Sequence, residues 1–240
     1  MASAAPAPTR TETDSLGSME IPADAYWGIH TARADANFPI TKRPISVYPD
    51  LVVALAMVKQ ASARANREIG VLDPERADLI DRAAQRVIDG EFHDQFTVGV
   101  IQGGAGTSTN MNANEVITNI ALELAGREKG DYAFLSPIDH TNRSQSTNDV
   151  YPTAVKIGLS LTLRSLLEEL DLLRISFLHK SHEFHDVLKV GRTQLQDAVP
   201  MTLGQEFHGF ASTLGYDHTR LTENASLMFE INMGLSLIHI

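Results

Sequence analysis

The feature that most constrains the fold is a long run of apolar residues at helical spacing in the second half of the chain. This spacing predicts one amphipathic helix that extends to about residue 188, and a further helical stretch runs from residue 202 to about residue 233. The connector between them, KVGRTQLQDAVP, is short, so the two helices are most simply an antiparallel pair that begins a helical bundle. The apolar residues that set the period are Ile157, Leu161, Leu163, Leu167, Leu170, Leu173 and Phe177.

The part of the chain before this pair is mixed in character but mostly helical. Residues 21–40 lack a helical period and are predicted to form loops and short extended pieces, and the segment QFTVGVI, residues 95–101, is a candidate short strand. A doubly wound sheet is excluded because strands and helices do not alternate after Gly130. The predicted fold class is therefore mainly α. The helices predicted in this part cover residues 51–69, 74–89 and 109–124.

The chain is predicted to divide into four segments. Residues 1–15 are rich in Ala, Pro, Thr and Ser and are predicted to be a disordered tail. Residues 16–145 form a mostly helical N-terminal domain, and residues 146–234 begin a central helical-bundle domain that stays incomplete. Residues 235–240, LSLIHI, are mainly apolar and fit no obvious role, so they are interpreted as a non-native tail.

Composition excludes several classes of partner. The formal net charge is −10 and no basic block is present, so neither nucleic acid nor an anionic membrane surface is expected to bind. No apolar run is long enough to span a bilayer, and the N-terminus lacks the apolar centre of a secretory signal. The absence of cysteine removes disulfides and thiolate ligands and fits a reducing compartment, so we expect a cytoplasmic protein.

Three polar clusters concentrate the candidate chemistry. The first cluster is GGAGTSTN at residues 103–110, the second is HTNRSQSTND at residues 140–149, and the third is GRTQLQDA at residues 191–198. In the first cluster, glycine lets the backbone approach a ligand, and the helix that follows favours an anion at its start. This cluster has neither the Gly-Lys-Ser/Thr ending of a phosphate loop nor a G-x-G-x-x-G pattern, which points to a carboxylate rather than a nucleotide.

Each cluster also has a purely structural interpretation. The first could be a tight turn with a helix cap, the second a cap for the long helix, and the third a connector between helices. As a set, however, they place neutral hydrogen-bond donors at helix ends without a strong base, which suits a carboxylate whose charge grows in a transition state. His179, His182 and His185 have a spacing that could suggest a metal, but no H-E-x-x-H motif is present and a solvated helix face is favoured. No metal and no cofactor are predicted.

Four stretches give residues 16–234 a family resemblance. In order and spacing, IPADAYWGIHTARADANF, DQFTVGVIQGGAGTSTNMNANEV, DHTNRSQSTNDVYPTA and GRTQLQDAVPMTLGQEF resemble signature stretches of the aspartase/fumarase superfamily, and most closely those of its aspartate ammonia-lyases. The resemblance implies L-aspartate and fumarate as substrates, and a homotetramer in which three subunits contribute to each active site. The residues that it implies for substrate binding are Thr107, Ser146, Thr147, Asn148, Thr193 and Gln194.

Two positions favour the aspartase branch over the fumarase branch. In fumarases the third cluster resembles Gly-Arg-Thr-His, and this chain has Gln194 in place of that His. Fumarases also have a His-Pro-Asn-Asp-His stretch, where this chain has Ser-Pro-Ile-Asp-His at residues 136–140. Some aspartases also have His at the Gln194 position, so this residue argues against fumarase more than it argues for aspartase. The implied reaction is reversible anti-elimination of ammonia from L-aspartate through an aci-carboxylate intermediate. A fumarase-type hydratase is the alternative within the superfamily.

The catalytic base of the family is a Ser in a mobile Gly-Ser-Ser-x-x-x-Pro-x-Lys-x-Asn loop, and nothing in this sequence matches that loop. No catalytic residue is therefore assigned. We expect a chain that is truncated after the first two bundle helices, inactive by itself and with apolar helix faces exposed. The alternative from another class is a non-catalytic truncated subunit that assembles with complete subunits.

Overall fold

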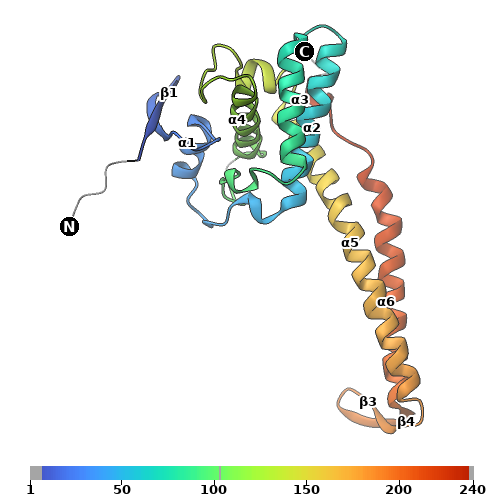
Figure 1. Ribbon diagram of the computed structural model, residues 1–240. Helices are drawn as coiled ribbons and strands as arrows, with labels where there is room; N and C mark the ends of the chain where they lie inside the picture. Colours follow the sequence, from blue (N-terminus) through green and yellow to red (C-terminus); the bar gives the residue numbers. More distant parts are fainter. Residues whose placement is uncertain (1–6, 103, 238–240) are drawn as a thin grey trace, which may run out of the picture. The chain divides into compact units, whose positions relative to one another are not determined.

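The computed structural model describes residues 7–102 and 104–237 and divides the chain into two compact units. The first unit comprises Met1–Gly158 and Ile231–Ile240, and the second comprises Leu159–Glu230. Helices dominate both units, which confirms the predicted mainly α fold class (Figure 1). None of the described helices is long and apolar enough to cross a membrane.

Three helices form the core of the first unit, and they are the three that the sequence predicts there. They are α2 (Pro49–Glu68), α3 (Pro74–Ile88) and α4 (Thr107–Leu124). Proline occupies the first turn of α2 and of α3, where its missing N–H group is not needed. Most of α4 is buried, including polar side chains that belong to the candidate site. The largest fully buried apolar side chains are Ile21, Leu55, Ile80, Phe96, Ile117, Ile120, Leu122 and Leu135.

The first described element is an antiparallel hairpin of β1 (Thr9–Asp14) and β2 (Gly17–Pro22). The prediction of a disordered tail up to residue 15 is therefore wrong for β1, whereas residues 1–6 lie outside the described residues. Composition misled the prediction because the segment is polar, yet the hydroxyl groups of Thr9 and Thr11 donate to the Glu20 carboxylate on the opposite strand at 2.6 Å each.

Two charged side chains of β1 attach the hairpin to the rest of the first unit. The Arg10 guanidinium donates a hydrogen bond to the carbonyl oxygen of Trp27 at 2.7 Å. The Glu12 carboxylate accepts hydrogen bonds from the Ile29 backbone N–H at 2.8 Å and from the Tyr132 hydroxyl at 3.0 Å. These partners lie up to 120 residues away along the chain, so the order of β1 depends on tertiary contacts.

A short helix, α1 (Ile29–Asn37), lies where loops and extended pieces are predicted. The prediction is wrong here because the start of α1 is stabilised by Glu115, a residue of α4 that is distant in sequence. The buried Glu115 carboxylate accepts hydrogen bonds from the backbone N–H groups of Gly28, His30 and Thr31 at 2.8–3.0 Å, and from the Thr31 hydroxyl at 2.7 Å. Burial raises the pKa of Glu115, and these hydrogen bonds act in the opposite direction.

The short strand predicted at residues 95–101 does not form among the described residues. The segment begins with the end of a 3₁₀ turn, η2 (His93–Gln95), and then makes only an isolated bridge between Gly99 and Pro44. Pro44 has no backbone N–H group, so a regular ladder cannot continue through it. The segment contributes Phe96 to the core instead of joining a sheet.

The second unit is a pair of long helices that are joined by a hairpin. Helix α5 (Thr147–Glu183) begins in the first unit and continues into the second, and α6 (Leu203–Ala225) lies beside the second-unit part of α5 (Figure 1). The rings of Phe177 and Phe207 pack between the helices with their centroids 5.9 Å apart. The unit division falls inside α5, so the predicted domain boundary at residues 145 and 146 stays a prediction.

The connector between the two long helices is itself regular. The strands β3 (Leu188–Thr193) and β4 (Gln196–Thr202) form an antiparallel hairpin with an irregularity between Gly191 and Arg192. A capping box then starts α6: Gln205 N donates to the Thr202 hydroxyl, and the Gln205 side chain accepts from Thr202 N. Helix α6 ends at residue 225, earlier than predicted, and a 3₁₀ turn, η4 (Ser226–Met228), follows it.

Residues after the second unit return to the first one. Asn232 N donates to the Thr153 hydroxyl at 3.1 Å, and Ser236 N donates to the Asp149 carboxylate at 2.9 Å. Residues 235–237 form a last 3₁₀ turn, η5 (Leu235–Leu237), and residues 238–240 of the predicted non-native tail lie outside the described residues.

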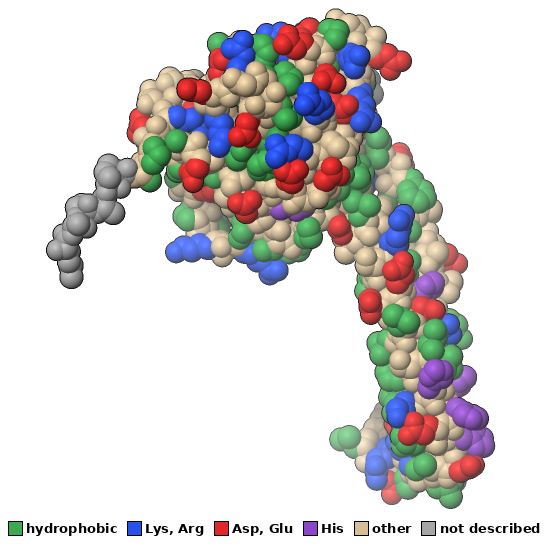
Figure 2. Space-filling view, viewed as in Figure 1, with side chains coloured by type: hydrophobic (Ala, Val, Ile, Leu, Met, Phe, Trp, Pro, Cys, Tyr) green, Lys and Arg blue, Asp and Glu red, His purple; other side chains and the backbone are tan. Residues whose placement is uncertain are grey.

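The described surface carries mixed charge and several exposed apolar side chains. On the face shown in Figure 2, acidic and basic side chains are intermingled over the first unit. Several exposed large apolar residues lie on the long helices of the second unit. They include Leu159, Leu166, Leu172, Leu173, Phe210 and Tyr216.

Candidate active site

Gly106 brings the first turn of α4 against the first turn of α5. Its φ angle is +85°, in the left-handed region that glycine adopts at little cost. A Cβ atom at this position would lie 2.2 Å from Cγ of the Tyr151 ring, far inside contact distance. A residue without a side chain therefore lets the helix that carries Thr107 begin beside the helix that carries Thr147. Gly103, the first residue of the first cluster, lies outside the described residues.

A side chain from the preceding loop closes the first turn of α4. Gln102 Oε1 accepts a hydrogen bond from Thr109 N at 2.9 Å, and Gln102 Nε2 donates to the Thr109 hydroxyl at 2.6 Å. The N-cap residue itself is Gly106, which has no side chain to occupy the earliest N–H groups. The exposed Thr107 therefore lies at a helix start whose dipole favours an anion.

The second cluster forms the start of α5 and is joined directly to α4. The Ser146 hydroxyl accepts a hydrogen bond from Asn148 N at 3.2 Å, which shapes the entry to the helix. The Thr147 hydroxyl oxygen accepts a hydrogen bond from Asn110 Nδ2 at 2.9 Å. Asn110 lies one turn after Thr107 in α4, so this single bond connects the first cluster to the second.

A fully buried lysine lies at this junction. Lys59 of α2 donates from Nζ to Asn110 Oδ1 at 2.6 Å, to Asn142 Oδ1 at 2.9 Å and to Gln145 Oε1 at 2.9 Å. Burial lowers the pKa of Lys59 well below its usual value, because the charge is removed from water. Three amide oxygens nevertheless match the three protons of an ammonium group, so the cluster is arranged around the charged form.

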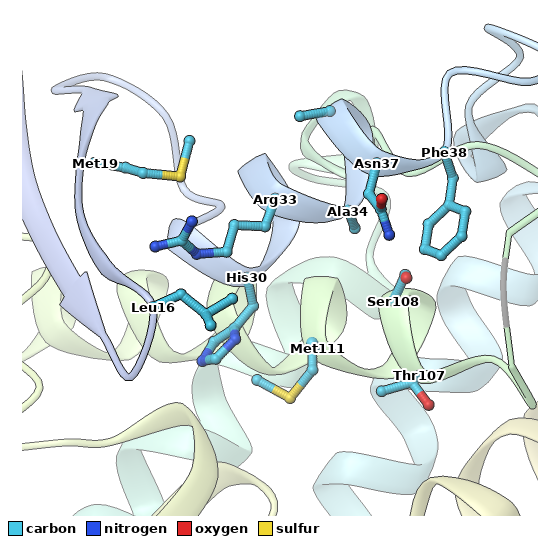
Figure 3. Close-up of a pocket in the computed structure, with 11 residues that line it drawn as sticks. Leu16, Met19, His30, Arg33, Ala34, Asn37, Phe38, Thr107, Ser108 and Met111 are labelled. Carbon is cyan, nitrogen blue, oxygen red and sulfur yellow. The ribbon is translucent and has the colours of Figure 1, made fainter.

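A cavity of about 570 Å³ opens beside the start of α4. Thr107 and Ser108 line one side of it, and His30 and Arg33 of α1 lie on another (Figure 3). The Arg33 guanidinium is paired with both carboxylate oxygens of Asp14, at 2.7 and 2.8 Å. A ligand in this cavity would therefore meet the hydroxyl groups of Thr107 and Ser108, which make no hydrogen bond within the described residues, and an arginine whose charge is already balanced.

The third cluster forms the tip of the hairpin in the second unit. Gln194 and Leu195 have φ angles of +47° and +66°, as required for the two central residues of a tight type I′ turn. Thr193 and Gln194 are exposed. The structure thus places Thr107 with the second-cluster residues in the first unit, and Thr193 with Gln194 in the second unit. The substrate-binding roles of these residues stay predictions.

Comparison with known proteins identifies the family to which the chain belongs. A family model described as lyase matches residues 17–238, nearly the whole chain. The aspartate ammonia-lyase of Pseudomonas aeruginosa is 58% identical to the chain over 229 residues, which cover 95% of the chain and 48% of the relative. The chain belongs to the aspartase/fumarase superfamily of lyases.

A second aspartate ammonia-lyase matches the chain over nearly the same length. The aspartate ammonia-lyase of Escherichia coli strain K12 is 49% identical over 230 residues, which cover 95% of the chain and 48% of the relative. The chain spans about half the length of the curated relatives it matches. The superfamily relationship therefore covers the first cluster, the second cluster and the third cluster together.

Solved structures of the superfamily share the fold. A fumarate lyase:delta crystallin from Brucella melitensis is 53% identical, with a TM-score of 0.92 over 95% of this chain and 53% of that chain. A class II fumarase from Schistosoma mansoni is 34% identical, with a TM-score of 0.84 over 95% of this chain and 48% of that chain. The same architecture thus occurs in superfamily proteins whose names denote different reactions.

Sequence reasoning missed Lys59 and Gln102, and it included Asn110 only as the last residue of the first cluster, without a role; all three organise the site from inside. A signal for Lys59 was present, because it continues the spacing of the buried Val52 and Leu55 on the apolar side of α2. A lysine on the buried apolar side of a helix such as α2 requires hydrogen-bond partners inside the protein, since an unpaired buried charge is very unfavourable.

Proposed function

We propose that the chain supplies substrate-binding groups for the reversible deamination of L-aspartate to fumarate and ammonia. The observation that carries this proposal is the Asn110–Thr147 hydrogen bond, which joins two clusters of neutral donors at two helix starts. The chain has high sequence identity to proteins named aspartate ammonia-lyase, and it has Gln194 at the position where the fumarase motif has His. Both observations favour aspartate over malate as substrate.

The proposed mechanism is an elimination that the site favours electrostatically. A base removes a proton from the carbon next to the side-chain carboxylate, and the electron pair of that C–H bond moves into the carboxylate to give a doubly charged aci-carboxylate. The pair then returns to form the C=C bond of fumarate while the C–N bond breaks and ammonia leaves. Donors that already point at the growing charge lower the energy of this intermediate without reorganisation.

Each predicted residue has a role in this scheme. Thr107, Ser146 and Thr147 donate to the carboxylate on which charge develops, and the N-terminal ends of α4 and α5 add their dipoles. Asn148, Thr193 and Gln194 hold the second carboxylate and the amino group and so fix the orientation of the substrate. The proton-abstracting base comes from residues outside this sequence, which contains no Gly-Ser-Ser stretch.

A homotetramer is part of the proposal. Supporting observations are the exposed apolar side chains of α5 and α6, and the exposed Thr193 and Gln194 at the hairpin tip. Burial of such helix faces between subunits would complete the bundle and bring the third cluster of one subunit to the first and second clusters of others. We place this assembly in the cytoplasm, since a chain without cysteine fits a reducing compartment.

A joined protein tests the function directly. It consists of residues 1–234 of this chain followed by the part of the Pseudomonas aeruginosa relative that comes after the equivalent of residue 234, with the unmodified relative as control. We expect fumarate, followed by its ultraviolet absorbance, from L-aspartate and not from L-malate. Fumarate from L-malate would favour the fumarase-type hydratase. A folded tetramer that acts on neither substrate would favour the non-catalytic subunit and contradict the proposal.

A further inference from the structure

The buried Lys59 cluster has a defined hydrogen-bond polarity. Gln145 Nε2 donates to the backbone carbonyl oxygens of Thr141 at 2.9 Å and Arg143 at 3.2 Å. A carbonyl can only accept, so the nitrogen of this amide must face the backbone and its oxygen must face Lys59. The ammonium group, which can only donate, then imposes the same orientation on every other amide that it contacts.

The polarity continues from Lys59 to Asn110. Because Asn110 Oδ1 faces the ammonium group, Asn110 Nδ2 must point the other way. Its two protons have two acceptors, Asn142 Oδ1 at 3.1 Å and the Thr147 hydroxyl oxygen at 2.9 Å. The Asn110 amide thus has all its hydrogen-bonding groups occupied, and it is 1% exposed, so it cannot turn over without leaving buried groups unpaired.

The end of this series is the Thr147 hydroxyl. Its oxygen accepts from Asn110, so its own proton is left to donate to something else. Within the described part of the chain, no acceptor for that proton is found, and Thr147 is only partly buried. We infer that Lys59 is a positioning residue, which fixes the Asn110 amide so that the Thr147 hydroxyl is held as an outward donor for a substrate carboxylate.

This inference rests on the proposed function, because it assigns a direction to a donor that the proposal places on the substrate. The physical gain is preorganisation. A free threonine hydroxyl can donate or accept, whereas one that is forced to accept from inside presents a proton outward before the substrate arrives. The nearby positive charge of Lys59 also polarises the Asn110 amide and so strengthens the bond that holds Thr147.

Replacing Asn110 by Asp reverses the polarity with little change of shape. One carboxylate oxygen still accepts from Lys59, but the other now faces the Thr147 hydroxyl as an acceptor and draws its proton inward. In the joined protein we expect Asn110→Asp and Thr147→Val each to lower kcat/KM for L-aspartate by about 10²–10³-fold, the usual cost of one such donor. The double variant should be little worse than either, because both remove the same donor.

Asn114→Asp is the matched control. Asn114 lies one turn further along α4, is equally buried and also donates to Asn142 Oδ1, at 3.2 Å, but within the described residues it makes no hydrogen bond to Lys59 or Thr147. It places a carboxylate in the same cluster without reversing the Thr147 hydroxyl, so its kcat/KM should fall far less than that of Asn110→Asp. Circular dichroism of the same variants in this 240-residue chain checks that they fold.

The outcomes separate the inference from the function. A damaging Thr147→Val with a nearly unaffected Asn110→Asp would overturn the positioning role and leave the proposed function intact. A silent Thr147→Val would overturn the inference and the donor role of Thr147, whereas the L-aspartate turnover that it retains would leave the proposed reaction intact. If Asn110→Asp does not fold, Lys59→Gln replaces it, because a Gln amide has only two protons to donate and lets Asn110 turn over; unchanged kcat/KM in Lys59→Gln would then overturn the inference.

Discussion

Replacing Gly106 by Ala measures how firmly the junction between α4 and α5 depends on the contact with Tyr151. An L side chain in the left-handed region costs about 1.5 kcal/mol, and loss of glycine entropy from the unfolded chain returns about 0.7 kcal/mol. The new Cβ would also lie 2.2 Å from Cγ and 2.5 Å from Cδ2 of Tyr151, and overpacking of this kind costs about 2 kcal/mol. We therefore expect the free energy of unfolding to fall by about 3 kcal/mol.

Gly126→Ala separates the contact from the backbone strain. Gly126 follows the other end of α4 with a φ angle of +71°, and a Cβ there would meet nothing within 4 Å. The Gly126→Ala variant should lose only about 1 kcal/mol in free energy of unfolding, which is the cost of the left-handed backbone minus the gain from the lower entropy of the unfolded chain. Urea unfolding followed by fluorescence suits both variants, because Trp27, the only tryptophan, lies in the first unit. Equal losses for the two variants would refute the role assigned to Tyr151.

Three further changes test other parts of the structure. Glu115→Gln should lower the free energy of unfolding by about 2–3 kcal/mol, because an amide NH₂ group replaces an acceptor oxygen among four donors. The control Glu123→Gln, at an exposed residue, should lower it by under about 1 kcal/mol. Both values are measured by urea unfolding followed by Trp27 fluorescence. Burial lowers the pKa of Lys59 in the folded state, so between that lowered pKa and about pH 10.5 the unfolded chain holds a proton that the folded chain has released. Wild-type stability relative to Lys59→Met should rise with pH inside this window and stay level below it, where Lys59 is an ammonium group in both states; a difference that stays flat up to about pH 10.5 in urea titrations would contradict this. Thr202→Ala removes the cap of α6 and should cost about 1 kcal/mol, seen as an earlier loss of helical circular dichroism in urea; an unchanged midpoint would refute the cap.

The sequence predicted elements whose stability is encoded locally. Helices α2 and α3 carry their own apolar period and their own first-turn proline, so each can be read from a short window of residues. Helix α1 could not be predicted in this way, because the carboxylate at its start belongs to Glu115 in α4. The same applies to β1, whose polar side chains become ordered only when distant partners bond to them.

For the site, the sequence indicated which chemical groups are present but not how they are held. The second cluster marks Thr147 as one of several neutral donors at a helix start, and the family resemblance implies that it binds substrate. Its direction depends on Asn110 and Lys59, which are 37 and 88 positions away, and no local pattern reports such a contact. Lysine is normally assigned to the surface, so a buried one is found only when its place on the helix stripe is considered.

The attachment of β1 has a practical consequence for anyone who shortens or tags the chain. A trim that followed composition alone would start the protein at residue 16 and discard Arg10 and Glu12. The Ile29 N–H and the Tyr132 hydroxyl would then each lose an acceptor, and the buried start of α1 would depend on Glu115 alone. An affinity tag is therefore better placed ahead of residue 7, with the whole of β1 retained.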